Sequence, residues 1–307
     1  MSTVSVALAA WRGEKWIGAQ LESLLAQERV PDEIVICDDS PDSLTGNAVE
    51  PFLRRDSRIH YHRNLVRLGI CRNFEAAFRR CTGEFIFPAD QDDVWDRGKV
   101  ARLCRELEDH PECELVFCDS RVVDGDGREL GYSAWELQGR TLEAIVRIPA
   151  GELEEQLLIR PLGYAHDMAF RRTLLETALP FPSIEACHDF WLASLAAAQG
   201  RLRVVPERLT AYRCHTGNYT QVERGGFTAR LRELIRRGRS ERERTGRLYA
   251  ALAERLAAVD LSPERRELIE GLAAYHLRRG AGHLASWHDY RRFGQGVRSL
   301  LRDLLLF

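Results

Sequence analysis

The sequence predicts an α/β fold in which a mixed, mainly parallel sheet is flanked by helices and followed by an α-helical C-terminal extension. Apolar runs of strand length alternate with amphipathic helical segments in the first half of the chain, which is typical of a sheet with helices on both faces. Acidic residues follow two of these runs directly. From Phe227 onward, long Leu, Ala, Arg and Glu segments contain one proline, Pro263, and favour helices.

The N-terminal half opens with the pattern of a β-α-β unit. Residues 4–10 form an apolar run that predicts a buried strand, and apolar side chains recur at helical spacing across residues 14–27. A second apolar run at 33–37 leads directly into Asp38 and Asp39. The same reasoning predicts a strand at 58–62, a helix at 72–81 and a strand at 84–87.

The second half alternates less regularly. Residues 115–123 read as a strand, and the Asp-Gly-Asp-Gly turn at 124–127 predicts a hairpin after it. An amphipathic pattern at 188–199 predicts a helix with Asp189 in its first turn. The remaining predictions are a helical segment at 141–158, strands at 165–170, 202–205 and 209–213, and three or four helices after residue 226.

The chain has 307 residues, 45% of them hydrophobic and 29% charged, which is enough for one large domain or two. We expect a catalytic domain at 1–225 and a basic helical extension at 226–307. The net charge of −2 argues against a nucleic-acid-binding protein. The extension carries 17 basic and 10 acidic side chains, a net of +7, so the body carries the remaining −9.

The cysteine pattern and the N-terminus predict a cytoplasmic protein. The eight cysteines include no Cys-x-x-Cys pair, which excludes the usual zinc and redox dithiol spacings and favours buried thiols in a reducing compartment. The N-terminal residues lack the basic start and apolar core of a signal peptide, and no run of 18 apolar residues occurs.

A cluster of carboxylates follows the predicted strand at 84–87, consisting of Asp90, Asp92, Asp93 and Asp96. These side chains would repel one another unless cations neutralise them, and oxygen ligands of this kind suit Mg²⁺ or Mn²⁺ together with substrate phosphates. The cluster therefore predicts a site for a diphosphate ligand. The alternative is a solvated acidic turn in which Asp96 caps the next helix.

A second carboxylate pair, Asp38 and Asp39, follows the strand at 33–37. It is compatible with an Asx turn, or with recognition of ribose hydroxyls and base N–H groups of a nucleoside. Because ligands of parallel α/β sheets bind beyond the carboxyl ends of the strands, the two acidic clusters should share one edge of the sheet. Their common position favours the functional interpretation of both.

Several segments resemble family 2 glycosyltransferases of the GT-A (Rossmann-like) fold, and in particular their bacterial rhamnosyltransferase-like branch. The resemblance covers about residues 3 to 220, and its motifs occur in the right order. They are the Asp-Glu-Ile-Val-Ile-Cys-Asp-Asp-Ser run at 32–40, Gly-Glu-Phe-Ile-Phe at 83–87, Asp-Gln-Asp-Asp-Val-Trp at 90–95, His-Asp-Phe-Trp at 188–191 and Tyr-Arg-Cys-His at 212–215.

The resemblance implies metal-dependent, inverting transfer of a sugar, rhamnose or another hexose, from a dTDP- or UDP-linked donor. The acceptor would be a glycan or lipid-linked hydroxyl in cell-surface polysaccharide synthesis, and the cofactor Mn²⁺ or Mg²⁺. It assigns catalytic base chemistry to Asp189 and metal binding to Asp90, Asp92 and His215, with Asp93 in support. The residues assigned to the nucleotide are Asp38, Asp39, Ala9, Arg12, Asp90 and Arg72.

Some of these residues have a plainer interpretation. Asp189 is also an acidic residue favoured by the dipole of a helix start, and Arg72 is also an exposed helix-start arginine. His215 is a loop histidine of a kind that is often structural. The His166-Asp167 pair resembles His188-Asp189 and is predicted as an acceptor-side candidate.

The nucleotide pocket departs from the family pattern. Trp11-Arg12-Gly13 replaces the usual Tyr-Asn-Gly, and Ser40-Pro41-Asp42-Ser43 replaces Asp-Gly-Ser-Thr-Asp, which leaves the base and the sugar open. Two other functions also stay open: a sugar-nucleotide pyrophosphorylase, and a non-catalytic module that binds sugar nucleotides or glycans. The first would need a glycine-rich basic loop for a triphosphate, of which Trp11-Arg12-Gly13 is a poor version.

The basic extension has two interpretations. Residues 227–256 contain nine arginines and four acidic residues beside a stripe of leucines. Such a surface is compatible with peripheral contact at the inner membrane face, or with packing on the catalytic domain or on a second subunit of a homo-oligomer. The apolar residues at 304–307 are too few to span a bilayer, although they could dock in a groove.

Overall fold

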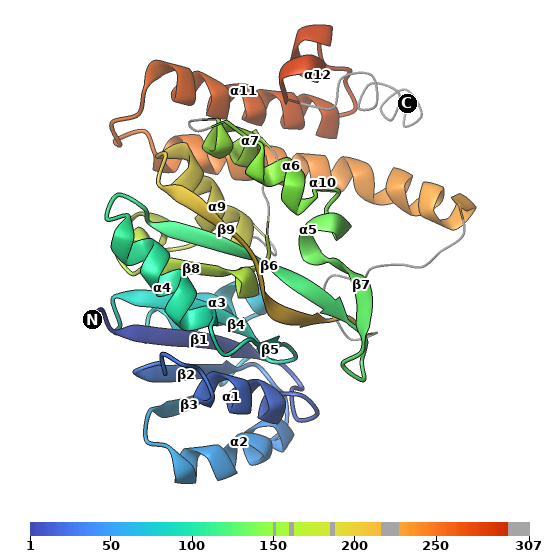
Figure 1. Ribbon diagram of the computed structural model, residues 1–307. Coiled ribbons are helices and arrows are strands. Elements are labelled where there is room, and N and C mark those ends of the chain that lie inside the picture. Colours follow the sequence, from blue (N-terminus) through green and yellow to red (C-terminus); the bar gives the residue numbers. More distant parts are fainter. Residues whose placement is uncertain (150–151, 160–162, 185–187, 216–226, 294–307) are drawn as a thin grey trace.

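Nine strands form one mixed sheet in the computed structural model, which describes residues 1–149, 152–159, 163–184, 188–215 and 227–293 (Figure 1). The strands are β1 (Val4–Ala10), β2 (Glu33–Asp38), β3 (Ile59–Arg63), β4 (Phe85–Asp90), β5 (Val94–Trp95), β6 (Leu115–Val123), β7 (Glu129–Ser133), β8 (Met168–Arg171) and β9 (Leu202–Arg213). Their order is β3-β2-β1-β4-β8-β6-β9-β5, with β7 paired to β6.

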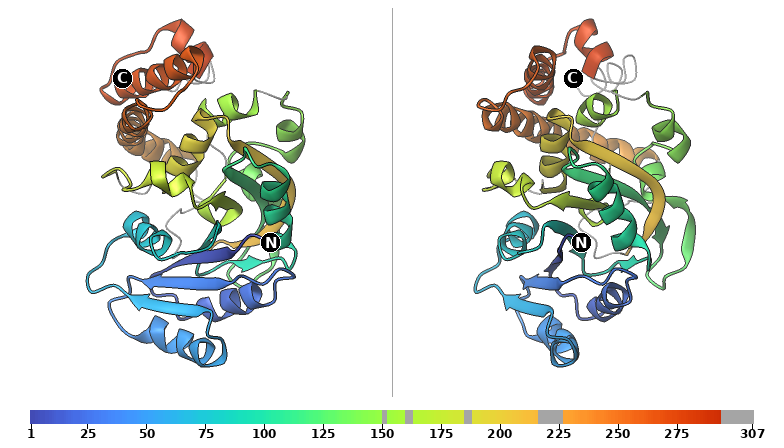
Figure 2. Two further views of the ribbon diagram at one scale, coloured as in Figure 1. Left: turned by 90° about the vertical axis from the view of Figure 1, so that its left-hand side faces the viewer. Right: turned by 60° about the vertical axis from the view of Figure 1, so that its left-hand side comes forward.

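Helices cover both faces of this sheet (Figures 1 and 2). The helices are α1 (Ile17–Leu25), α2 (Leu44–Arg55), α3 (Ile70–Phe78), α4 (Lys99–Asp109), α5 (Ala134–Leu137), α6 (Leu142–Val146), α7 (Leu153–Ile159), α8 (Leu174–Ala178), α9 (His188–Ala198), α10 (Phe227–Arg255), α11 (Pro263–Gly280) and α12 (Trp287–Phe293). The buried side chains of α1, α2 and α4 form one core cluster, and those of α3, α7 and α9 form the other. The predicted mixed sheet with flanking helices is confirmed.

The first strand shows why the N-terminal half could be predicted. Six of the seven residues of β1 are buried, because β1 lies between β2 and β4 and is covered on both faces. Val6 and Leu8 point into the cluster with α1 and α4, whereas Ala7 points into the cluster with α3. A strand that is buried on both faces reads as a continuous apolar run.

Parallel pairing brings the two acidic clusters to one edge of the sheet, as predicted. Strand β1 is parallel to both β2 and β4, with Ala10 opposite Asp38 and Ala9 opposite Asp90. The N–H of Asp39 donates to the carbonyl of Ala10 at 2.9 Å, so the chain stays paired just beyond the end of β2. Ala9, predicted to meet the nucleotide, therefore lies between the ends of β2 and β4.

Helix α2 is absent from the prediction, and α4 is expected only as a helix after Asp96, without bounds. Helix α2 contains Gly46 and Pro51 and buries only Thr45 and Val49, so its apolar periodicity is weak. Helix α4 is strongly amphipathic, and Asp96 before it pairs with Arg121 at 2.6 Å instead of capping it through its side chain.

Several predicted elements of the second half have other boundaries. The strands at 202–205 and 209–213 are one strand, β9, whose register against β6 shifts near Asp119. The segment at 141–158 divides into α6 and α7. The strand at 165–170 begins as one turn of 3₁₀ helix at Ala165–Asp167 and becomes strand β8 only at Met168. The predicted hairpin is confirmed as the antiparallel pair β6 and β7.

The C-terminal extension is helical, as predicted, and lies beyond α9 at the end of the molecule opposite β3 (Figure 1). Leu248, Leu252 and Leu268 of α10 and α11 belong to the same buried cluster as Trp191 and Leu195 of α9. The expected boundary at residue 225 lies outside the described residues. None of the helices described here is long and apolar enough to cross a bilayer.

Candidate active site

Asp38 is engaged in the turn that leaves β2. Its carboxylate accepts hydrogen bonds from the N–H and the hydroxyl of Ser40, at 2.9 and 2.5 Å, and from the hydroxyl of Tyr61 at 2.6 Å. The residue is fully buried. The carboxylate of Asp38 thus accepts the hydrogen bond of an Asx turn. An Asx turn was one of the two interpretations of Asp38, the other being recognition of a nucleoside.

Asp39 holds the loop between β3 and α3. Its carboxylate accepts hydrogen bonds from the side-chain amide of Asn64 at 2.7 Å and from the backbone N–H groups of Leu68 at 3.1 Å and Gly69 at 2.7 Å. Gly69 has a φ of +80° and precedes the first residue of α3. Glycine adopts this left-handed conformation without strain, which lets its N–H turn toward the carboxylate.

Asn73 of α3 ties this network to the strand ends. Its side-chain amide donates to the carbonyls of Cys37 at 2.9 Å and Ala10 at 3.3 Å, and its oxygen accepts from Asn64 at 2.7 Å. Asn73 thereby joins the ends of β1 and β2 to the loop that surrounds Asp39. These contacts join residues far apart in the chain, so they depend on the fold.

The loop after β1 is clamped to the acidic motif by Gln91. The N–H and carbonyl of Trp11 pair with the side-chain amide of Gln91, both at 2.8 Å. A side chain at Gly13 would collide with Gln91. Arg12 has a φ of +51°, its N–H donates to the hydroxyl of Ser40 at 2.8 Å, and its side chain is exposed. The sequence predicts no role for Gln91, which stands among acidic residues.

Asp92 and His215, predicted as metal ligands, lie together. The Nε2 of His215 is 2.9 Å from the Oδ2 of Asp92, and their side chains are 20% and 14% exposed. The imidazole ring stacks on Trp16 with centroids 5.6 Å apart, and the Arg213 guanidinium lies 4.6 Å from the same indole. This pair is partly exposed and offers one oxygen and one nitrogen to a cation.

Asp90 faces a different histidine. The Nδ1 of His166 is 3.1 Å from the Oδ2 of Asp90 and 3.2 Å from the Oδ2 of Asp93, and its Nε2 is 3.5 Å from Asp167. His166 is 1% exposed, whereas the Asp90 side chain is 31% exposed. His166 thus lies behind the acidic motif, and its buried ring does not face an acceptor as the sequence suggested.

Within the described part of the chain, Asp90, Asp93 and His166 are the one set of three His, Cys, Asp or Glu side chains whose ligand atoms all lie within 4.8 Å of one another. We call these three residues the inner set, and Asp92 with His215 the outer pair. The predicted trio of Asp90, Asp92 and His215 is therefore divided between the two groups.

Burial and mutual electrostatic interactions shift the pKa values of Asp90, Asp93 and His166. Burial disfavours the charged imidazole, but the carboxylates of Asp93, Asp167 and Asp90 outweigh it and raise the pKa of His166 to about 10. Burial likewise acts on Asp90, yet the hydrogen bond and charge of His166 hold the pKa of that carboxyl below its ordinary value. Burial and the neighbouring carboxylates raise the pKa of Asp93. His166 is consequently an internal cation at neutral pH.

A second buried cation, Lys99, lies beneath His166. Its ammonium group donates to the carbonyl of His166 and to the hydroxyl of Thr210, the latter at 2.8 Å, and lies 3.9 Å from the centre of the Trp95 ring. Lys99 is fully buried. Lysine is rare in this chain, since the only other one is Lys15. The compact ammonium fits where a planar guanidinium does not.

We expect Lys99→Arg to destabilise the protein by about 1–3 kcal/mol, because the larger guanidinium overpacks this space. Urea unfolding measures the change. The matched control is Lys15→Arg, in which an exposed lysine 4.0 Å from the Trp16 ring is replaced; it should shift the free energy of unfolding by less than about 0.5 kcal/mol. Equal stabilities of the two variants would contradict the packing argument.

Asp189 lies in the first turn of α9, where it is half-buried and its carboxylate accepts the N–H of Phe190 at 2.7 Å. The preceding His188 is buried and stacks on Phe74 of α3 with centroids 4.2 Å apart. Arg72 pairs with Glu75, its neighbour on α3, and reaches Ser183 at 3.4 Å. The guanidinium of Arg72 thus contacts a residue of its own helix, α3, and a residue of the segment before α9.

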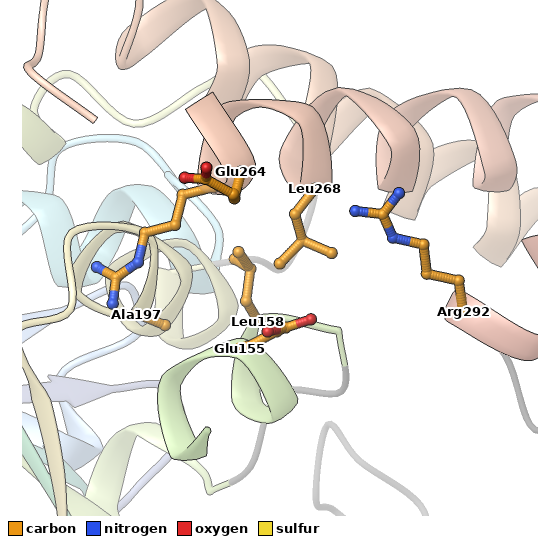
Figure 3. Close-up of a pocket in the computed structure, with 7 residues that line it drawn as sticks. Glu155, Leu158, Ala197, Glu264, Leu268 and Arg292 are labelled. Atoms are coloured by element: carbon orange, nitrogen blue, oxygen red, sulfur yellow. The ribbon is translucent and has the colours of Figure 1, made fainter. Parts of the chain in front are cut away.

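A cavity of about 210 Å³ lies elsewhere, between α7, α9, α11 and α12 (Figure 3). On α9 it is lined by Ala197, eight residues beyond Asp189, which corresponds to about 12 Å along a helix. The cavity therefore belongs to the contact with the extension and not to the acidic edge. Its other lining residues are Glu155, Leu158, Glu264, Arg265, Leu268 and Arg292.

Several curated proteins have similar sequences. An uncharacterized glycosyltransferase of Nostoc is 23% identical over 220 residues, covering 70% of this chain and 66% of its own length. The uncharacterized glycosyltransferase EpsJ of Bacillus subtilis is 26% identical over 228 residues, covering 71% and 63%. The Escherichia coli protein WfaP, a UDP-Glc:α-D-GlcNAc-diphosphoundecaprenol β-1,3-glucosyltransferase, is 32% identical over 117 residues, covering 38% and 44%. The chain thus spans less than two thirds of the length of these relatives.

Solved structures share the fold. Residues 1–349 of Staphylococcus aureus TarS, in complex with UDP-GlcNAc, align with a TM-score of 0.63 at 16% identity, over 98% of this chain and 81% of that one. The mannosyltransferase PcManGT of Pyrobaculum calidifontis, in complex with GDP-Man and Mn²⁺, aligns with a TM-score of 0.58 at 19% identity, over 99% and 85%.

The family model for glycosyl transferase family 2 matches residues 5–177, which is more than half of the chain. This range contains all of β1 except Val4, together with β2 to β4, both acidic clusters and the loops that surround them. On the sequence match and the shared fold together, the protein belongs to glycosyl transferase family 2.

Proposed function

We propose that this protein is a metal-dependent, inverting glycosyltransferase that transfers a hexose from a nucleoside-diphosphate sugar to a hydroxyl acceptor. The observation that carries the proposal is the arrangement at one edge of the sheet. Asp39, Asp90 and the pair of Asp92 with His215 gather at the ends of β2 and β4. Burial raises the pKa of Tyr164, and the charge of Asp189 raises it further. Because the Tyr164 ring stacks on His166 behind Asp90, the start of α9 is within electrostatic range of the residues at this edge.

The outer pair fits a divalent cation. Asp92 and His215 supply one carboxylate oxygen and one imidazole nitrogen that already approach each other within 2.9 Å and stay accessible. Mn²⁺ accepts this mixture of ligands readily, and Mg²⁺ would rely more on the carboxylates. When bound, the cation would stabilise the charge on the leaving diphosphate. Asp90 would contribute the carboxylate oxygen that does not meet His166.

The protein's own residues would supply the rest of the chemistry. Asp39 lies near the nucleoside, in a loop fixed by Asn64 and Asn73. Asp189 accepts the proton of the acceptor hydroxyl while that oxygen attacks the anomeric carbon from the face opposite the diphosphate. The bond to the leaving nucleoside diphosphate breaks as the new glycosidic bond forms, so the configuration inverts.

For the substrates we propose a UDP- or dTDP-linked hexose, rhamnose included, and a glycan or lipid-linked hydroxyl. The names of relatives support this choice, because both WfaP and WfgD of Escherichia coli are named as transferring glucose from UDP-Glc to a diphosphoundecaprenol-linked sugar. TarS and PcManGT support a nucleotide-sugar donor more generally, since their complexes contain UDP-GlcNAc and GDP-Man.

A thermal-shift panel of UDP, dTDP and GDP sugars with and without Mn²⁺ tests the donor and the metal together. A ligand at 100 times its dissociation constant stabilises the folded state by about 2.7 kcal/mol, so the true donor should raise the melting temperature clearly. We expect this rise to disappear with EDTA and in Asp92→Ala. The matched control is Asp126→Ala, at an exposed acidic residue of the β6–β7 turn. A shift that survives both EDTA and Asp92→Ala would contradict the metal site.

A further inference from the structure

The C-terminal extension contacts α9, the helix that carries Asp189, in its first turn and at its end. Tyr249 and Arg255 of α10 meet Phe190 and Trp191 in the first turn, and Arg265 of α11 meets the end. In Figure 1 both extension helices lie on the side of α9 that faces away from β1. The extension is thus placed to determine where α9 lies.

Tyr249 holds the beginning of α9. Its ring is fully buried and packs edge-on against Phe190, with centroids 5.3 Å apart and planes at 72°. Phe190 directly follows Asp189. The hydroxyl of Tyr249 donates to the carbonyl of Leu158 in α7, and its other face stacks on His276 of α11 at 5.6 Å. One side chain therefore connects α10, α11 and α7 to the first turn of α9.

Arg255 holds the segment that leads toward α9. Its guanidinium donates to the carbonyls of Thr177 at 2.6 Å and Pro180 at 2.8 Å, and it lies 5.4 Å from the centre of the Trp191 ring. The indole N–H of Trp191 donates to the carbonyl of Ala178 at 3.0 Å. Arg255 and Trp191 together fix the end of α8 against α9.

Arg265 holds the end of α9. Its guanidinium donates to the carbonyl of Ala198 at 3.4 Å, where a positive charge also complements the helix dipole. Gly200 follows with a φ of +69°, and a side chain there would collide with this guanidinium. The apolar side chains of α10 fill the space between these polar contacts.

Outside the extension itself, these contacts fall on α7, on α9 and on α8 with the residues just after it, and none of the residues named in them belongs to β1, β2 or β4. Through these residues the extension therefore supports the helix of the proposed base and does not touch the strands that lead to Asp39 and Asp90. A displacement of about 1 Å at a catalytic group can cost about a hundredfold in rate, so the support of α9 matters to the reaction.

We propose that the extension is part of the catalytic unit, with Tyr249 and Arg255 as positioning residues that hold α9 and so place Asp189 on the acceptor side. The inference rests on the proposed function for the role of Asp189. It gives the extension a task in turnover that is separate from donor binding.

The test compares Arg255→Ala with Arg247→Ala in the full chain. Arg247 is a matched control, because it lies two turns earlier on α10, is 65% exposed and pairs with Glu243 on its own helix. We expect Arg255→Ala to lower kcat about tenfold or more while the dissociation constant for UDP with Mn²⁺ changes less than about twofold. Arg255→Lys, which keeps the positive charge on a single donor nitrogen, and Tyr249→Phe, which keeps the ring, should lie between the wild type and Arg255→Ala.

Hydrogen exchange supplies a readout that does not depend on activity. Amides in the first turn of α9, within residues 188–192, should exchange faster in Arg255→Ala, and those of β1 and β4 should not change. Unchanged exchange at α9 would overturn the proposal that Tyr249 and Arg255 hold α9. Equal losses of kcat and of UDP binding in all variants would also overturn it. If the wild type turns over no sugar nucleotide, the proposed function fails. Faster exchange in α9 of Arg255→Ala would still support the proposal that the extension holds this helix.

Discussion

Asp189→Asn should lower the turnover of sugar transfer at least about a hundredfold, because general base catalysis is typically worth about 10²- to 10⁴-fold. Asparagine keeps the size of the side chain and its hydrogen bond to the N–H of Phe190, but it accepts no proton at neutral pH. Binding of UDP with Mn²⁺ should stay within about twofold of the wild type, since the residues proposed for the donor and the metal lie outside α9, at the ends of β2 and β4 and just after β9. Steady-state kinetics and calorimetry measure the two quantities separately.

The control for this variant is Asp126→Asn, in an exposed turn, which should leave turnover unchanged. The plainer role of Asp189, a carboxylate that complements the helix dipole, predicts a loss of about 0.3–1 kcal/mol in stability and no loss of rate. Turnover of Asp189→Asn near the wild-type value would therefore leave only that structural role. A non-catalytic binding module would show binding but no turnover in either protein.

The parts of the fold that could be predicted are those whose burial leaves a local pattern. Strands β1, β2 and β4 are covered on both faces and so read as apolar runs, and the runs of β2 and β4 lead at once into Asp38 and Asp90. Because parallel strands align their carboxyl ends, Asp39 and Asp90 could be placed at one edge before any contact was known. Helix α2 left no such pattern, since it buries little and contains Pro51.

The contacts within the site could not be predicted, because they join residues far apart in the chain. His166 meets Asp90 across 76 residues, and Gln91 meets Trp11 across 80. One local signal did point to the first of these. A His-Asp pair stands at residues 166–167 before the apolar run that becomes β8, and buried polar groups of this kind need partners. The sequence could indicate that a partner existed, but only the sheet order β4-β8-β6 brings His166 beside Asp90.

His166→Phe should destabilise the folded protein by about 3–5 kcal/mol near pH 7, because it leaves the buried carboxylates of Asp93 and Asp167 without their cation. Phenylalanine keeps a ring beside Tyr164 and Tyr212, which stack on the imidazole at 5.5 and 4.9 Å, so the loss of charge is the main change. Urea unfolding measures the difference. The control is His60→Phe at an exposed position of β3, which should change the free energy of unfolding by less than about 0.5 kcal/mol.

The pH dependence of this difference tests its electrostatic origin. The pKa of His166 is raised from 6.5 to about 10 in the folded protein, so the folded state holds a proton that the unfolded chain releases near pH 6.5. The stabilisation by His166 is therefore complete below about pH 6.5, declines as the pH rises, and is lost near pH 10. The stability gap between the wild type and His166→Phe should narrow steadily from pH 6.5 to 9.5. A difference in the free energy of unfolding that stays constant across this range would mean that the His166 ring carries no charge in the folded protein. His166 would then contact Asp90 by packing without an ionic attraction.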